Sequence, residues 1–351
     1  IVEAPALDVA GILSRAEAYR AAGADVIDIG CLPDTPFPHL EEAVAALGQA
    51  GLAVSVDSAD ADELRRGGHA GASYLLSLSE ETLAIADEVD AVPVLIPARH
   101  GDLDSLLRAM AALDARGRRY IADPILDPIH FGFTESLGRY AELRRRRPDA
   151  EILMGTGNLT ELTDADSSGV NAVLMGIVSE LRITNVLVVQ VSPHCRRAVK
   201  ETDAARRIMF AAREEGSLPS GIDAALLCLR DRKPFVNTPA EIAELAAQLS
   251  DDNFRIEVAE DGIHLYNRRG HHVAADPYEL FPHLQVERDG SHAFYLGVEM
   301  AKAQIAWQLG KRYVQDRLLG WGVAVDRPAE DLTEFKEAGT TLQAKQKKTG
   351  A

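Results

Sequence analysis

Acidic side chains recur where short apolar runs of this sequence come to an end. The five that stand out are Glu3, Asp28, Asp57, Asp123 and Asp127. A carboxylate buried at a strand end costs several kcal/mol unless it finds hydrogen-bond donors. A heterocycle with adjacent ring N–H and amino groups would supply two of them. We therefore expect these side chains to bind a flat, nitrogen-rich ring, and the alternative is that they cap loops or accept from backbone amides.

A second polar group follows the last two apolar runs of the same region. Asn158 comes shortly after one run, and His194, Arg196 and Arg197 follow the next. The planar guanidinium group suits phosphate oxygens. A basic helix start is the other explanation, although the positive end of a helix dipole disfavours cations there. We interpret this basic segment as an anion site.

The elements that must position these side chains alternate along the chain. Short β-branched runs at intervals of about 25 residues indicate strands over 1–4, 25–30, 52–58, 73–79, 91–98, 119–126, 151–156 and 185–192. Amphipathic stretches such as 12–23 and 103–117 separate them. This alternation predicts parallel pairing, and eight strands favour a closed (β/α)8 TIM barrel. No GxGxxG follows an early run, which weighs against a dinucleotide-binding fold.

The rhythm changes after Gly216. The expected elements are a loop at 214–221, a helix at 238–250, an antiparallel hairpin within 254–279 and a helix at about 292–318. We therefore expect a barrel over 1–215, a C-terminal α+β domain over 216–336 and a disordered tail over 337–351.

Composition limits the classes of partner. The formal net charge is −17, which argues against binding to nucleic acid or to an anionic membrane surface. Three scattered cysteines do not form a disulfide framework and indicate a reducing cytoplasm. No apolar run approaches the roughly 20 residues that span a bilayer. The chain begins with Ile1 in what reads as the end of a strand, so we expect residues to precede it.

Three segments together resemble the pterin-binding barrels, namely dihydropteroate synthase and the methyltetrahydrofolate-dependent corrinoid methyltransferases. They are "GADVIDIG", "AVSVDS" and "ADPILDPIHFGF", and the resemblance spans about 1–215. The segment "SHAFYLGVEMAKAQIAWQLGKRYVQD" is similar to the extra domain of dihydropteroate synthase-like proteins associated with tetrahydromethanopterin formation. That resemblance implies a further N-terminal domain in the same chain.

The resemblance implies roles for the acidic residues. Asp57 and Asp123 match the aspartates that hold the amino and ring nitrogens of the pterin. Asp28 matches an aspartate of the second strand whose role is partly structural. Glu3 corresponds to a metal-binding position, with Mg²⁺ on the diphosphate of the substrate. Asp127 is a further candidate.

It also implies roles for the other polar residues. His194 and Arg196 match a closing Arg-x-His that contacts the diphosphate, with Arg197 as an alternative for the same contact. Asn158 stands where the synthases have a lysine, in a segment more like that of the methyltransferases, and Gly155 precedes it. At the end of the fourth strand one polar pterin contact is either absent or replaced by Ser77 or Ser79.

The function that the resemblance implies is a transferase of the dihydropteroate synthase type. It joins a dihydropterin diphosphate to an arylamine, ribofuranosylaminobenzene phosphate in tetrahydromethanopterin biosynthesis, and acts as a homodimer. One alternative is a methyl-tetrahydropterin methyltransferase that serves a corrinoid protein and uses Asn158. Another is a non-catalytic pterin-binding module.

Overall fold

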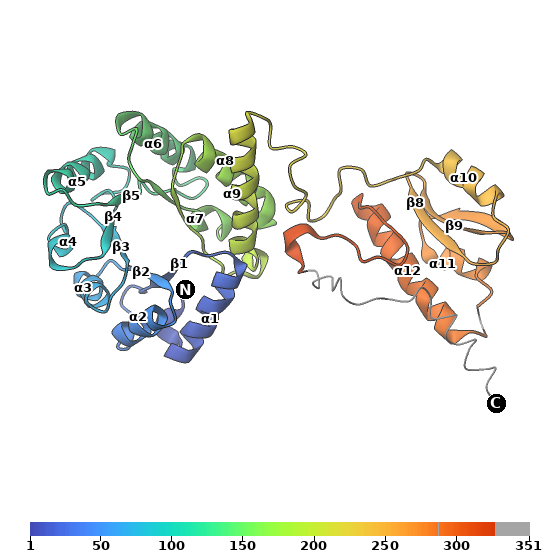
Figure 1. Cartoon of the computed structure of the whole chain (residues 1–351), viewed down its shortest axis with the longest axis horizontal. Helices are drawn as coiled ribbons and strands as arrows, with labels where there is room; N and C mark the ends of the chain where they lie inside the picture. The colour runs from blue at the N-terminus through green and yellow to red at the C-terminus, as the bar shows by residue number, and fades with distance from the viewer. Residues whose placement is uncertain (287, 327–351) are drawn as a thin grey trace.

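The computed structural model describes residues 1–286 and 288–326. The tail expected at 337–351 therefore lies outside the described residues. Figure 1 shows two groups of elements joined by an extended segment after α9. No helix in the described ranges is both long enough and apolar enough to span a membrane.

The first group of elements is built on parallel strands. They are β1 (Val26–Gly30), β2 (Ala53–Asp57), β3 (Tyr74–Leu78), β4 (Val92–Leu95), β5 (Ile121–Ala122), β6 (Leu153–Gly155) and β7 (Asn185–Leu187). β1 to β5 form one sheet in chain order, and β6 pairs with β7. A parallel bridge between Ala122 and Ile152 connects the two sheets. The barrel architecture expected from the sequence is confirmed, with seven parallel strands in the described part of the chain.

Helices follow the strands and surround them, as Figure 1 shows for α1 to α6. They are α1 (Val9–Ala22), α2 (Leu40–Gln49), α3 (Ala61–His69), α4 (Ile85–Glu88), α5 (Leu103–Ala115), α6 (Phe133–Arg146), α7 (Gly157–Thr160), α8 (Ser167–Glu180) and α9 (Ala198–Glu215). Asp8, Asp60 and Asp102 cap the first turns of α1, α3 and α5 through their carboxylates.

Alternate residues of the strands pack into two different hydrophobic layers, one outside and one inside the barrel. Ile27, Ile29, Val54 and Val56 point outward into the cluster that the helices cover. Leu76, Val94, Ile121 and Leu153 form a smaller cluster inside the barrel, with Tyr74, Val92 and Leu187 packed against it. Because successive side chains of a strand alternate between faces, this division fixes which polar residues point into the lumen.

The strand expected at 1–4 is wrong. Residues Ala4–Ala6 form a 3-10 turn, η1, with Pro5 in its first turn. Proline has no N–H to give to a sheet and fixes φ near the helical value, so the chain turns there. The strand expected at 185–192 is also shorter, since β7 ends at Leu187.

The second group of elements has its own core. α10 (Pro239–Ala247) precedes an antiparallel sheet of β8 (Arg255–Ala259), β9 (Gly262–Asn267) and β10 (Gly270–Ala274), followed by α11 (Pro277–Leu280) and α12 (Gly290–Leu309). The expected hairpin is confirmed and gains a third strand. The long helix ends earlier than expected because Gly310 takes the left-handed conformation of a helix C-cap, with φ +67°. The domain boundary at 215 stays a prediction.

Close packing of α3 on β2 depends on a missing side chain. A Cβ at Gly67 would lie 2.8 Å from Cγ2 of Val56, whereas a Cβ at Gly138 in α6 would meet nothing within 4 Å. We expect Gly67→Ala to lower the free energy of unfolding by about 1–3 kcal/mol through overpacking. Gly138→Ala, the matched control, should raise it by up to about 1 kcal/mol through helix propensity. Urea unfolding measures both, and equal effects would contradict the packing argument.

Candidate functional site

Three of the carboxylates predicted as ligands face the lumen of the barrel, Asp57 from the end of β2, Asp123 from just after β5 and Asp28 from the middle of β1. Asp28 and Asp57 alternate with the outward residues of β1 and β2, and Asp123 directly follows the lumen-facing end of β5. Asp57 lies close enough to raise the pKa of both other carboxyls by charge repulsion. The structure therefore brings Asp28, Asp57 and Asp123 together, and their role as ligand-binding residues stays a prediction.

Two of these carboxylates accept a hydrogen bond from a serine on the next strand of the parallel sheet. Asp28 of β1 is opposite Ser55 of β2, and the Ser55 hydroxyl donates to Asp28 Oδ1 at 2.6 Å. Ser77 of β3 donates in the same way to Asp57 Oδ1 at 2.6 Å. The hydroxyl of Ser77, one of the two candidates for the replaced pterin contact, thus orients the Asp57 carboxylate.

Asp123 is held from two sides. Its Oδ1 accepts from the backbone N–H of Ile125 at 2.8 Å and from the hydroxyl of Tyr140 at 2.8 Å. Tyr140 is fully buried in α6. Within the described chain, the hydrogen bonds of all three carboxyl side chains use Oδ1. The three Oδ2 atoms remain acceptors for a ligand.

The backbone is strained next to two of these carboxylates. Ser77 has φ +71° and Ile125 has φ +63°, in the left-handed region. A β-branched residue rarely adopts this conformation, and each such position costs about 1–3 kcal/mol. Strain of this kind is retained where the surrounding structure fixes a functional geometry. Both residues donate to a carboxylate, so the strain sets the positions of Asp57 and Asp123.

Burial changes the acidity of the group. It raises the pKa of Asp28 to about 6, and the neighbouring charge of Asp57 adds to the effect. Burial also raises the pKa of Asp123 to about 6 and that of Asp57 in the same direction. A ligand that donates N–H groups would stabilise the charged forms and relieve this cost.

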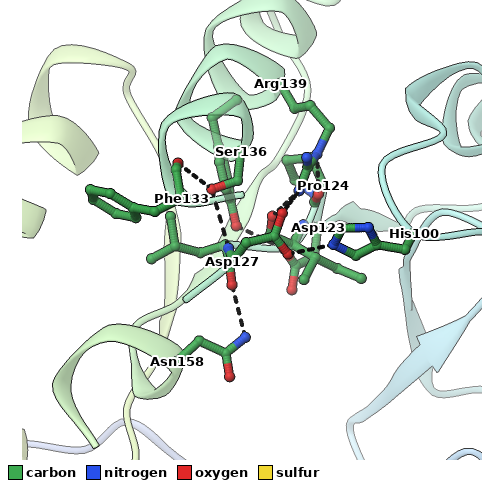
Figure 2. A network of polar contacts seen from close by, with 11 residues as sticks. His100, Asp123, Pro124, Asp127, Phe133, Ser136, Arg139 and Asn158 are labelled. Carbon is green, nitrogen blue, oxygen red and sulfur yellow. Dashed lines mark hydrogen bonds and ion pairs between the residues drawn. The ribbon is translucent and has the colours of Figure 1, made fainter. Parts of the chain in front are cut away.

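Asp127 belongs to a neighbouring ion-pair network. Figure 2 shows its carboxylate between Arg139 and His100, at 2.7 and 2.8 Å. Burial tends to raise the pKa of Asp127, but hydrogen bonds from Arg139 and His100 lower it below the usual value. With both carboxylate oxygens engaged, Asp127 fixes the loop after β5 rather than facing a ligand.

Asn158 and Gly155 lie at the end of β6. The Asn158 side-chain amide donates to the backbone oxygen of Leu126 at 2.8 Å (Figure 2), while the residue stays exposed. Gly155 is the last residue of β6, and a Cβ there would meet nothing within 4 Å. Both residues are on the loop side of the barrel, at the same strand ends as the carboxylates.

The predicted anion site is only partly available. His194 Nε2 lies 3.1 Å from the backbone oxygen of Thr160. Arg197 makes a two-pronged ion pair with Asp326, at 2.9 and 2.6 Å. Arg196 is exposed, and the described residues provide it with no ion-pair partner. Of the two arginines, Arg196 is the one free to meet an external anion.

Glu3, the predicted metal-binding position, has one carboxylate oxygen that is paired and one that is not. Its Oε1 pairs with Arg15 of α1, while its Oε2 is buried without a hydrogen-bond partner. In the described ranges, no three His, Cys, Asp or Glu side chains form a cluster that could hold a metal ion. Mg²⁺ commonly needs only one or two carboxylates besides substrate phosphates. Glu3 fits such a role.

Sequence reasoning missed the residues that orient the carboxylates. They are Ser55, Ile125, Tyr140 and, in the adjoining network, His100 and Arg139. The period-2 pattern that places Asp28 in the lumen also places Ser55 there, so Ser55 could have been found. Nothing in the sequence indicates that Tyr140 of a distant helix reaches Asp123.

A second cavity lies beside the cluster, between the loops that follow β1 and β2. It measures about 420 Å³ and is lined by residues 31–36, 58–60 and 63. Asp34, Asp60 and Glu63 are in its wall, and its lining includes neither lysine nor arginine. This cavity suits a group that donates hydrogen bonds better than an anion.

Comparison with known proteins gives one curated relative. The chain is 28% identical over 359 residues to the uncharacterized protein MJ0107 of Methanocaldococcus jannaschii, covering 90% of this chain and 68% of that protein. No protein-family model matches.

Solved dihydropteroate synthases resemble part of the chain. One from Yersinia pestis with a pterin–sulfa conjugate has 20% identity and a TM-score of 0.47, covering 59% of this chain and 90% of its own. One from Coxiella burnetii in complex with pteroic acid has 17% identity and a TM-score of 0.47, covering 60% of this chain and 87% of its own. At this level of similarity the chain's own geometry must carry the argument for function.

The raised acidity predicts a pH dependence of stability. Asp28 and Asp123 have an ordinary pKa of 3.8 and a folded pKa of about 6. Between these values the unfolded chain releases protons that the folded chain retains, so stability falls as pH rises from about 4 to 6. Asp123→Asn, which keeps an acceptor oxygen, should flatten this slope in urea unfolding at several pH values.

The matched control is Asp149→Asn, in an exposed turn before β6. It should leave the slope as in the unmodified protein. An Asp123→Asn slope identical to that of the control would show that Asp123 ionises normally.

Proposed function

We propose that this protein is a transferase of the dihydropteroate synthase type that joins a dihydropterin diphosphate to an arylamine. The observation that carries the proposal is the lumen cluster of Asp28, Asp57 and Asp123. Each carboxylate is oriented through one oxygen and keeps the other for a ligand. The amino and ring N–H groups of a pterin are donors that match these acceptors.

The reaction makes modest chemical demands. The amine nitrogen attacks the exocyclic methylene of the pterin, a C–N bond forms, and the C–O bond to the diphosphate breaks. The diphosphate leaves with the electron pair, and the amine loses a proton. The protein must hold the two substrates in line and stabilise the departing charge.

Asp57 and Asp123 hold the pterin in this proposal, and Asp28 supports the same pocket. The raised pKa of Asp123, about 6, reflects burial that a ring N–H would compensate. The strained backbone at Ile125 fixes the Asp123 carboxylate before the ligand arrives. Such preorganisation lowers the cost of binding.

The leaving diphosphate needs positive charge. Arg196 is exposed at the loop end of the barrel, and His194 lies two residues before it. Mg²⁺ carried by the diphosphate would neutralise part of its charge, and Glu3 Oε2 would be its protein ligand. Arg197 can join only if Asp326 releases it.

The cavity after β1 and β2 favours a particular amine. Its carboxyl groups at Asp34, Asp60 and Glu63 would repel the carboxylate of p-aminobenzoate but accept from ribose hydroxyls. In this proposal the second substrate is the ribosylated amine of tetrahydromethanopterin biosynthesis, ribofuranosylaminobenzene phosphate, whose ribose hydroxyls suit this cavity and whose phosphate must lie outside it. The homodimer and the further N-terminal domain stay predictions.

One observation favours a second candidate, a non-catalytic pterin-binding module. The Arg197 ion pair with Asp326 removes a cation from the expected diphosphate site. Methyl transfer to a corrinoid protein is less well supported, because a side-chain N–H of Asn158 already donates to the backbone oxygen of Leu126.

Pterin binding tests the role of Asp123. We expect Asp123→Asn to weaken the binding of 6-hydroxymethyl-dihydropterin diphosphate by about tenfold or more, because an acceptor-only group becomes one that also donates. Isothermal titration measures the affinity, and Asp149→Asn is the control. An unchanged affinity would place the pocket elsewhere.

Diphosphate release tests catalysis. With Mg²⁺ and the dihydropterin diphosphate, we expect faster release with ribofuranosylaminobenzene phosphate than with p-aminobenzoate. Arg196→Ala should lower the rate about tenfold or more. Arg145→Ala should not, because Arg145 pairs with Glu142 at the C-terminal end of α6. Tight pterin binding without release would favour the binding module.

A further inference from the structure

Helix α12 presents an apolar stripe to solvent on the face that points away from the C-terminal sheet. Its other face packs against β8 and β9 (Figure 1) and is formed by the buried residues Leu296, Met300, Ala303 and Ala306. The stripe consists of the exposed residues Phe294, Val298, Ala301 and Ile305. Phe294 is 76% exposed, so the stripe begins with a large apolar side chain that nothing in the described chain covers.

The spacing of the stripe is that of a coiled-coil contact. Its four residues follow one another at intervals of four, three and four positions along α12. A mean interval of about 3.5 residues keeps one narrow line of apolar side chains facing a partner helix. A helix that packs on a sheet or a broad core has a wider apolar face than this. The spacing therefore indicates a second helix as the occupant.

The stripe also lacks charge, in a protein that is strongly acidic. The Asp, Glu, Lys and Arg residues of α12 are Glu299 and Lys302 alone. Glu299 is buried, and Lys302 forms an ion pair with it. Because the formal net charge of the chain is −17, two copies repel one another over most of their surface. An uncharged stripe is a surface on which two copies can approach without this cost.

The chain that follows α12 returns along the same helix. Lys302 Nζ donates to the backbone oxygen of Arg317 at 3.1 Å, and the hydroxyl of Tyr295 donates to Asp316 at 2.7 Å. Leu318 follows directly and is also largely exposed. Exposed apolar side chains gathered in this way mark an interaction surface, whereas single ones are ordinary.

We propose that the stripe of α12 is a self-association surface on which two copies of this chain pair as antiparallel helices. A two-fold axis midway between Val298 and Ala301 makes the stripe complementary to itself. Phe294 of one copy then meets Ile305 of the other, and Val298 meets Ala301. The bulky residues lie at both ends and the small Ala301 lies near the centre, so the helices can approach closely. The contact lies outside the barrel and is independent of the proposed transferase activity.

The size of the surface sets the strength of the pairing. From Phe294 to Ile305 the stripe is about 16 Å long, at about 1.5 Å per residue. A fully buried aromatic side chain contributes on the order of 150–250 Å², and the remaining residues of the stripe are smaller. The pair therefore belongs to the class of weak contacts that bury less than about 1,200 Å² in total. We expect a dissociation constant on the order of 1–100 μM.

Sedimentation velocity of the full chain over a concentration series tests the self-association. Val298→Asp places a charge from each copy near the centre of the contact, so we expect the dissociation constant to rise about tenfold or more. Leu245→Asp is the matched control, because it changes an apolar residue of α10 that is 43% exposed, against 42% for Val298. It should leave the dissociation constant unchanged. Urea unfolding of both variants should match the parent, since both positions are exposed.

Disulfide cross-linking tests the antiparallel register. Phe294→Cys and Ile305→Cys are made separately, and the linked peptides are identified by mass spectrometry after mild oxidation. We expect the 294–305 link only when the two variants are mixed, because equivalent positions of the two copies are then about 16 Å apart along the axis. A 294–294 or 305–305 link in a single variant overturns the antiparallel pairing. A chain that stays monomeric at every concentration, or a dimer that Val298→Asp leaves unchanged, overturns the proposal.

Discussion

The candidate site depends on carboxylates that lie in the lumen of a parallel array, where water cannot fully solvate them. The register of the strands reduces this cost, because the carboxylates of Asp28 and Asp57 each accept a hydrogen bond from a serine hydroxyl of the neighbouring strand. Asp123 finds Tyr140 and a backbone N–H instead. These donors fix one oxygen of each carboxyl group. They do not offset the effect of burial, so the pKa values of Asp28 and Asp123 stay raised, at about 6.

The strain at Ser77 and Ile125 fits this arrangement. Both residues take a left-handed conformation next to the carboxylate that they orient. The β3–β4 ladder loses its regular register between Leu75 and Leu78, which lets Ser77 turn its hydroxyl toward Asp57. The packed helices that surround the strands hold these conformations, as a strained backbone persists only where its surroundings determine it.

Cations at the same end of the barrel are mostly committed to partners inside the chain. Arg139 holds Asp127, and Arg197 holds Asp326 from the far end of the described chain. An acidic protein thus keeps few free positive charges near an acidic cluster. The neighbouring cavity has the same character, because its lining includes Asp34, Asp60 and Glu63 and neither lysine nor arginine.

The sequence by itself determined the alternation of strands and helices and the acidic residues at or near the strand ends. Hydropathy with period 2 carries this information locally. Only the tertiary structure decided which strand lies beside which, that Tyr140 reaches Asp123 and that Asp326 pairs with Arg197. It also overturned the strand at 1–4, because Pro5 turns the chain. These contacts join residues that are 17 to 129 positions apart in the sequence, and a pattern read over a few neighbouring residues cannot predict them.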